Sequence, residues 1–385
     1  MSGMKVLEEE KKESNISNDV EKQSKESFAD KFFASIIGAL NVQTAYIGYK
    51  LGWYTTLSKN EQGLTCTQLA KLTNTSERYA QEWLEMQTVA GWVACADPSI
   101  EDAKQRVYYL PADHAEVLAN PDSLTYYLPM TRLQIGTVKV IDKLIEAYRN
   151  DTGVSWDEIG DDARDAQASM NRPFFLQVLP SSLEDVLDPA IVTKLHSTGG
   201  KIADIGAGCG WSSIGLAQHF KSSTVDLYDL DAPSVQRAHV NIAEYGLTNR
   251  IRAHCEDAAV AAASQHQDDA FDLVLALECI HDMADPISVL KTMRKLAGAT
   301  GTVIVMDELT NDKFSTDPNP LEHLLYGISC VCCLPDGKSG GASSVATGTV
   351  MRPSVFRMYA QQAGFKNVEI LPIESDLFRF YKLIF

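Results

Sequence analysis

From Lys201 to its end, the chain alternates between short apolar strands and amphipathic helices. Strands that alternate with helices pair in parallel, with helices on both faces of the sheet. The pattern therefore predicts an α/β fold for this half of the chain. The last two strands lie close together in sequence, so we expect a hairpin with an antiparallel C-terminal strand at the sheet edge. The predicted strands cover residues 201–206, 224–230, 251–257, 271–278, 301–308, 367–373 and 377–385.

A different pattern precedes this half. Residues 28–57 have apolar side chains at helical spacing, broken near Gly52. A short helix over 65–73, a second over 74–93 and a strand over 106–111 follow, which is the order of elements in a winged helix. The predicted N-caps are Thr65 or Thr67 for the first helix, and Thr75 or Ser76 for the second, which is expected to end at Gly91.

We divide the chain into four parts on these patterns. Residues 1–26 are polar and are expected to form a disordered tail. Residues 27–118 form a mainly helical winged-helix or dimerisation domain, and 119–195 are linker and lid helices with Met and aromatic side chains. Residues 196–385 form the α/β domain.

Charge limits the classes of partner. Asp and Glu number 51 against 34 Lys and Arg, for a formal net charge of −17, which disfavours nucleic acid and anionic membranes. Glu77, Glu82 and Glu85 outnumber Arg78 on the presumed recognition helix, so a scaffold or dimerisation role is preferred over DNA reading. No apolar run reaches ~18 residues and no secretory signal is visible, so we expect a cytoplasmic protein.

The cysteines fit a reducing compartment. The eight cysteines contain no CxxC pair, and disulfides are not expected. Cys330, Cys332 and Cys333 form a cluster for which burial as small apolar side chains is the preferred interpretation. A metal site that also uses His323 is the weaker alternative, and no metal is predicted.

A glycine-rich motif follows the first strand of the α/β half. The segment Asp204-Ile-Gly206-Ala207-Gly208-Cys-Gly210 stands between a strand and a helix. Its glycines let the backbone turn tightly and approach a ligand. The spacing differs from the GxGxxG dinucleotide motif. An acid at Asp204 suits a cation, such as the ammonium group of an amino-acid moiety.

Acids also end the next two strands. Asp229 and Leu230 end the second strand, and Asp257 and Ala258 follow the third. An acid at the end of the second strand can accept hydrogen bonds from both ribose hydroxyls. The acid after the third strand can accept from an adenine amino group.

Together these motifs and the segment 271–308 resemble a class I S-adenosylmethionine-dependent methyltransferase. The winged helix and the segment 348–365 resemble a microbial small-molecule subgroup. The resemblance implies a Rossmann-like seven-stranded sheet. It also implies that the three motif glycines line the methionine and ribose of S-adenosylmethionine, that Asp229 binds the ribose and that Asp257 binds the adenine amine. The predicted cofactor site is completed by Asp204, Ala207, Leu230, Ala258 and Glu278.

The fourth strand ends at Glu278, and His281-Asp282 follows. A neutral imidazole can take a hydroxyl proton near pH 7. The pair resembles the catalytic base of plant and fungal O-methyltransferases, in which an acid at the end of the next strand, here Asp307 or Glu308, orients the histidine. The tryptophan that commonly follows is Met283 here. His281 is either this base or a packing or positioning histidine.

The predicted function is therefore methylation of a small molecule, with O-methylation preferred and N- or C-methylation open. A homodimer through residues 28–60 is expected. The alternatives are a methyltransferase-fold enzyme with another reaction, a winged-helix regulator that senses the cofactor, and a protein methyltransferase.

Overall fold

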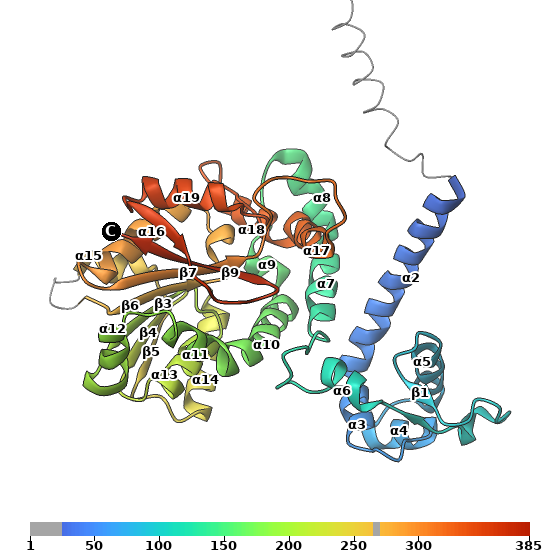
Figure 1. Cartoon of the computed structure of the whole chain (residues 1–385). Coiled ribbons are helices and arrows are strands. Elements are labelled where there is room, and N and C mark those ends of the chain that lie inside the picture. Colours follow the sequence, from blue (N-terminus) through green and yellow to red (C-terminus); the bar gives the residue numbers. More distant parts are fainter. Residues whose placement is uncertain (1–24, 265–269) are drawn as a thin grey trace, which may run out of the picture. The chain divides into compact units, whose positions relative to one another are not determined.

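The computed structural model describes residues 25–264 and 270–385, and the chain divides into two compact units between Leu110 and Pro111 (Figure 1). Most of the predicted tail lies outside the described residues, and its last two residues begin helix α2. The helical segment 119–195 belongs to the same compact unit as the sheet. Among the described residues, no helix is both long and apolar enough to cross a membrane.

The first unit contains the winged helix predicted within residues 27–118, and it ends at Leu110, so that residues 111–118 belong to the second unit. Gly52, with φ of 67°, separates the first two helices, as the sequence predicts. Thr65 caps the third helix through a capping box with Gln68. The two short strands pair in an antiparallel wing. The elements are α2 (Lys25–Lys50), α3 (Trp53–Ser58), α4 (Cys66–Thr73), α5 (Glu77–Val89), β1 (Ala94–Cys95), η1 (Ala103–Gln105) and β2 (Tyr108–Tyr109).

Helices also fill the chain between the wing and the sheet. The longest of them, α10 (Asp161–Gln177), packs closely against α7 (Met130–Lys139). Their core includes Cys332 and Cys333, which are buried as predicted, whereas Cys330 is exposed. The other elements are α6 (Ala112–Leu118), α8 (Ile141–Asn150), α9 (Trp156–Ile159), α11 (Leu179–Glu184), α12 (Pro189–Thr193) and η2 (Lys194–Thr198).

A seven-stranded sheet forms the centre of the second unit, in the order β5-β4-β3-β6-β7-β9-β8. Pairs among the first five strands of this order are parallel, and β9 is antiparallel to both of its neighbours. The strands are β3 (Lys201–Ile205), β4 (Thr224–Tyr228), β5 (Ile251–His254), β6 (Leu273–Leu277), β7 (Thr302–Glu308), β8 (Asn367–Ile370) and β9 (Phe378–Ile384).

The prediction that the final antiparallel strand lies at the sheet edge is wrong. The edge strand is β8, and β9 lies between β7 and β8. The burial of the side chains explains the order. In β9 the large side chains of Phe380, Tyr381 and Leu383 are at most 1% exposed, whereas in β8 only Val368 is buried. The more apolar strand therefore takes the position with a neighbour on each side.

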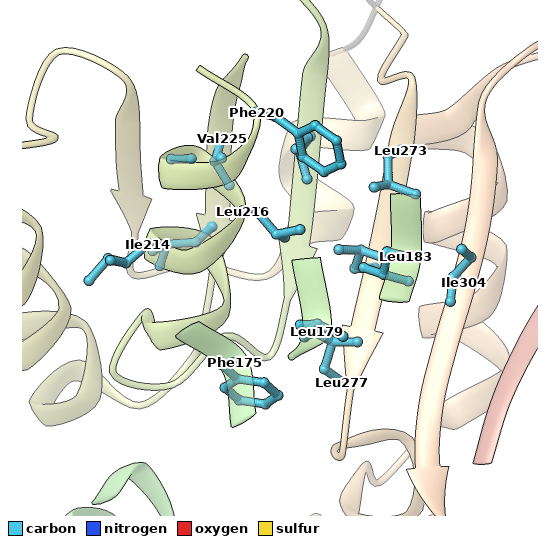
Figure 2. Packing of buried hydrophobic residues seen from close by; sticks show 14 of the residues in the cluster. Phe175, Leu179, Leu183, Ile214, Leu216, Phe220, Val225, Leu273, Leu277 and Ile304 are labelled. Atoms are coloured by element: carbon cyan, nitrogen blue, oxygen red, sulfur yellow. The ribbon is translucent and has the colours of Figure 1, made fainter. Parts of the chain in front are cut away.

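Helices cover both faces of the sheet. Leu179 and Leu183 of α11 and Leu216 of α13 belong to one core, shown in Figure 2. The opposite core contains Leu290 of α16 and Phe356 of α19. The remaining helical elements are α13 (Trp211–His219), α14 (Ala232–Glu244), α15 (Ala258–Ser264), η4 (Ile280–Asp282), α16 (Pro286–Ala297), α17 (Pro320–Ile328), η5 (Ser329–Cys333), α18 (Leu334–Ser339) and α19 (Pro353–Gln362).

Candidate active site

The glycine motif forms the loop between β3 and α13. Gly206, Gly208 and Gly210 all have positive φ, of 68°, 53° and 79°. A Cβ on Gly206 would lie 2.8 Å from Cys279 Sγ, and one on Gly210 would lie 3.2 Å from the Cβ of Ala238, whereas one on Gly208 would meet nothing within 4 Å. The outer two glycines therefore permit close packing. The middle one leaves the backbone open to a ligand.

Asp204 lies near the end of β3 and is fully buried. Its Oδ2 accepts hydrogen bonds from the hydroxyls of Ser212 (2.6 Å) and Ser213 (2.7 Å) in the first turn of α13. Its Oδ1 has no partner among the described residues. Burial raises the pKa of this carboxyl to about 6. Asp204 thus connects the end of β3 to the first turn of α13. Its Oδ1 is available for the predicted contact with an ammonium group, which stays a prediction.

Asp229 follows β4 directly and faces the glycine loop. Its carboxylate accepts the Gly208 N–H (2.8 Å) and the Asp231 N–H (2.8 Å). Burial raises its pKa. Leu230 beside it is 73% exposed. Because β4 is parallel to β3, the two strands bring this acid and the glycines to the same edge of the sheet.

Asp257 stands after β5, at the start of α15. It is exposed, and its carboxylate accepts the Ala259 N–H (2.8 Å), while Ala258 is buried. The helix that begins here was not predicted from the sequence. Asp257 therefore lies at the carboxyl end of β5, the strand that pairs with β4.

Arg164 of α10, whose side chain is 3% exposed, was not predicted from the sequence as a site residue. Its guanidinium donates to both carboxylate oxygens of Asp231, at 2.7 and 2.9 Å. Asp231 is also the N-cap of α14. The ion pair therefore ties the long helix of the 119–195 segment to the loop after β4. The two residues are 67 positions apart, and no local pattern marks them as partners.

His281 lies in the turn η4 after β6 and is 2% exposed. Its Nδ1 lies 2.6 Å from Asp307 Oδ1, and its Nε2 lies 3.1 Å from Asp282 Oδ1. Burial lowers the pKa of the imidazole, but the two carboxylates outweigh burial and raise it well above the usual value. Of the two acids considered as the orienting partner, the structure brings Asp307 to the histidine.

Two further carboxyls lie beside this histidine. Glu278 accepts hydrogen bonds from Gln167 Nε2 (2.7 Å) and from Asn171, both on α10, and burial raises its pKa to about 7. Glu308 is 8% exposed, and its carboxylate makes no hydrogen bond among the described residues. Burial, reinforced by the charge of Glu278, raises its pKa well above the usual value. Several buried carboxyl groups thus lie around His281 at the carboxyl ends of β6 and β7.

Of the three clustered cysteines, Cys333 lies beside His281. Cys333 lies close enough to His281 and Asp282 that one ligand atom of each falls within 4.8 Å of the others, a set that could hold a metal ion. His323, the residue named in the alternative of a metal site with the cysteine cluster, is exposed on α17 and is not part of this set.

Comparisons with known proteins agree with this geometry. A family model described as a methyltransferase domain matches residues 203–303, and one described as an Rv2258c-like winged HTH domain matches residues 38–120. The fold is similar to that of the mitomycin 7-O-methyltransferase MmcR, with a TM-score of 0.68 at 18% identity over 93% of this chain and 98% of that one.

Two other solved structures share the fold. Human N-acetylserotonin methyltransferase in complex with SAM has a TM-score of 0.67 at 14% identity, over 94% of this chain and 99% of that one. PigF with SAH has a TM-score of 0.68 at 16% identity, over 94% of this chain and 100% of that one.

The glycine loop and the strands on either side of β3, namely β4 and β6, lie within the segment that matches the methyltransferase-domain model. This chain is therefore a methyltransferase that uses S-adenosylmethionine, with an Rv2258c-like winged-helix domain ahead of its methyltransferase domain. The residues present fit the cofactor. The space beside Gly208 admits a ligand, and Asp229 and the free oxygen of Asp204 can accept from hydroxyl or ammonium groups.

Proposed function

We propose that this protein transfers a methyl group from S-adenosylmethionine to a hydroxyl group of a small molecule, with His281 as the general base. The observation that carries the proposal is the pairing of His281 Nδ1 with Asp307 at 2.6 Å, at the end of the strand next to the glycine loop. A carboxylate on Nδ1 holds the imidazole in the tautomer whose Nε2 can take a proton.

The cofactor, when bound, supplies an electrophilic methyl group, so alignment is the main task of the protein. In this proposal the backbone of Gly206–Gly210 holds the methionine and ribose part, together with the carboxyl of Asp204. Asp229 accepts from the ribose hydroxyls and Asp257 from the adenine amine. Ala207, Leu230, Ala258 and Glu278 line the same site. His281 removes the proton of the acceptor hydroxyl.

Asp282 has a second role in this proposal. Its Oδ1 lies 3.1 Å from Nε2, the nitrogen that would take the proton. Together with Asp307 it raises the pKa of the imidazole, so that the neutral, basic form is reached only at elevated pH. Asp282 therefore sets the pH range in which His281 works.

N-methylation of an amine is the second candidate. Four carboxyls lie around His281, and the Glu308 carboxylate has no hydrogen-bond partner among the described residues. Buried carboxyls favour a positively charged neighbour, and a protonated amine would meet that need. It would pass one proton to a neighbouring carboxylate before its free lone pair accepts the methyl group. The product distinguishes the two acceptors, because NMR locates the new methyl group on oxygen or on nitrogen.

The helices of 119–195 are proposed to close over the acceptor. Two amides of α10 already bind Glu278, and Arg164 of the same helix binds the loop after β4. This helix therefore spans the carboxyl ends of β6 and β4, where a lid over the reacting groups would stand.

A homodimer in the cytoplasm is proposed for the whole chain. Helix α2 exposes a row of large apolar side chains, which include Phe28, Phe32, Phe33, Ile36 and Leu40. Exposed apolar patches of this kind mark interaction surfaces, and a second copy of α2 would cover the row with the same chemistry.

The test uses S-adenosylmethionine with an isotopically labelled methyl group and fractionated small-molecule extracts. The expected result is a product heavier by one labelled methyl group in place of hydrogen, with S-adenosylhomocysteine formed in equal amount. Consumption of the cofactor without a methylated product would favour a different reaction of the fold. Salt-dependent binding of short DNA duplexes without turnover would favour the regulator.

A further inference from the structure

A second group of metal-ligand side chains lies away from the glycine loop. Glu184 ends α11, His196 lies in the turn η2 and His219 ends α13. His196 Nε2 lies 3.0 Å from Glu184 Oε1, and His219 Nε2 contacts the other oxygen, Oε2. The ligand atoms of the three residues lie within 4.8 Å of one another. Three segments of the chain thus converge on one carboxylate.

The core fixes the positions of these three side chains. Each ligand residue has a fully buried neighbour in the chain, namely Leu183, Leu195 and Phe220. Figure 2 shows Leu183 and Phe220 within the packed cluster of this face of the sheet. Backbone positions held by such packing change little when a ligand binds.

The two imidazole rings are also braced. The rings of His196 and His219 meet the ring of Phe220 edge-on, with centroid distances of 5.0 and 4.8 Å. The phenyl ring therefore limits the rotation of both imidazoles while their Nε2 atoms point to Glu184. The ordering entropy that metal binding normally costs is already met for these side chains.

We propose that Glu184, His196 and His219 bind a divalent transition metal ion of the zinc type. Two imidazole nitrogens and one carboxylate are a ligand set that Zn²⁺ accepts, with water in the fourth position. The side chains are 30–35% exposed, which gives the ion access. Without the ion, a neutral imidazole here carries its proton on Nε2, which faces the carboxylate of Glu184. On binding, that proton moves to Nδ1 so that the Nε2 lone pair faces the ion, and an imidazolium would in addition release its second proton to solvent.

The ion would act as a structural link. It joins α11, η2 and α13, which are separated in the chain, and so stabilises the folded second unit. His219 lies at the end of α13 opposite the glycine loop, and a helix of nine residues is about 13 Å long. The methyl-transfer site and this site therefore do not share residues, and the proposal does not depend on the proposed function.

The test is calorimetric titration of the full-length, chelator-stripped protein with ZnCl₂. We expect one site, with an affinity at least ~10-fold lower in each of His196→Ala, His219→Ala and Glu184→Gln. His239→Ala is the matched control, because this histidine is exposed on α14 outside the cluster. The affinity of this variant for Zn²⁺ should equal that of the unaltered chain. Saturating Zn²⁺ should raise the Tm by about 5 °C, and His196→Ala and His219→Ala should abolish the rise.

Co²⁺ distinguishes this site from the His281, Asp282 and Cys333 set. Binding at Glu184, His196 and His219 gives a cobalt spectrum without a thiolate charge-transfer band, and Cys333→Ser leaves it unchanged. Circular dichroism checks that each variant is folded, and Glu184→Gln, which keeps the size of the side chain, serves if an alanine variant unfolds. Absence of binding, equal affinity in all folded variants of the three ligands, or loss of binding in Cys333→Ser would each overturn the proposal.

Discussion

A side chain added at Gly208 tests whether the space beside the glycine loop holds the cofactor. Gly208→Val should lower the affinity for S-adenosylmethionine at least ~10-fold, because the branched side chain would enter the open space beside the loop and because its φ of 53° disfavours a β-branched residue. Isothermal titration calorimetry with S-adenosylmethionine measures the affinity.

Gly246→Val provides the control for backbone strain. Gly246 also has positive φ, 67°, and a Cβ at this position would also meet nothing within 4 Å, but it lies after α14 instead of in the glycine loop. The control should keep the affinity of the unaltered protein. Equal affinity in a folded Gly208→Val variant would contradict the assignment of the cofactor site.

His281 is the residue on which the proposed chemistry depends. His281→Ala should keep the cofactor affinity and lower kcat by ~10²-fold or more, which is the contribution typical of a general base. Steady-state kinetics and calorimetry on the same preparation separate the two effects. Full activity of the variant at every pH would exclude the role of base.

The pH profile gives a second test of this histidine. Because Asp282 and Asp307 raise the pKa of His281, the neutral base forms only well above the usual range, and kcat should rise as the solution becomes alkaline. Asp307→Asn removes one of these charges, so the rising limb of the profile should move to lower pH. A histidine with only a packing role would leave the position of this limb unchanged.

At the scale of elements, the ion pair of Arg164 with Asp231 joins α10 to the start of α14. Arg164→Met should lower the free energy of unfolding by about 3 kcal/mol, because it leaves Asp231, 15% exposed, without its cation. Urea denaturation measures the change. Arg149→Met is the control, since its pair with Glu146 is exposed and should contribute less than about 1 kcal/mol.

The pH dependence of this effect follows from Asp231. Burial raises the pKa of its carboxyl, but the hydrogen bonds from Arg164 and Ser234 outweigh burial and lower it. The stabilisation is then complete above the unfolded value, about 3.9, and is lost as the pH falls through the lower pKa of the folded protein. The difference between Arg164→Met and the unaltered protein should therefore shrink in strong acid, and a constant difference would contradict this account.

At the scale of the whole molecule, the exposed row on α2 predicts self-association. The double substitution Phe32→Asp and Phe33→Asp should convert a dimer to a monomer, because these side chains are 61% and 62% exposed in the single chain and charge would prevent their burial. Sedimentation velocity measures the state. Tyr79→Asp is the control, as this side chain is 76% exposed on α5. A monomeric unaltered protein would contradict the prediction.

Features that arise from neighbouring residues were predictable from the sequence. The positive-φ glycines of the loop, the capping box at Thr65 and the break at Gly52 follow from local conformational preferences. The order of strands and helices placed Asp229 and Asp257 at strand ends, since parallel strands end at one edge. The fold class, and the position of the glycines and of these two acids at one edge of the sheet, were therefore predictable.

Which distant groups meet became clear only from the three-dimensional arrangement. The internal position of β9, the choice of Asp307 over Glu308 as the partner of His281, and the contact of Arg164 with Asp231 depend on packing between separate segments. The convergence of His196 and His219 on Glu184 has the same origin. Local propensities constrain only a few successive residues. Contacts between residues tens of positions apart depend on how apolar side chains are buried together. Because one apolar pattern can be buried in several arrangements, the sequence alone does not say which distant residues meet.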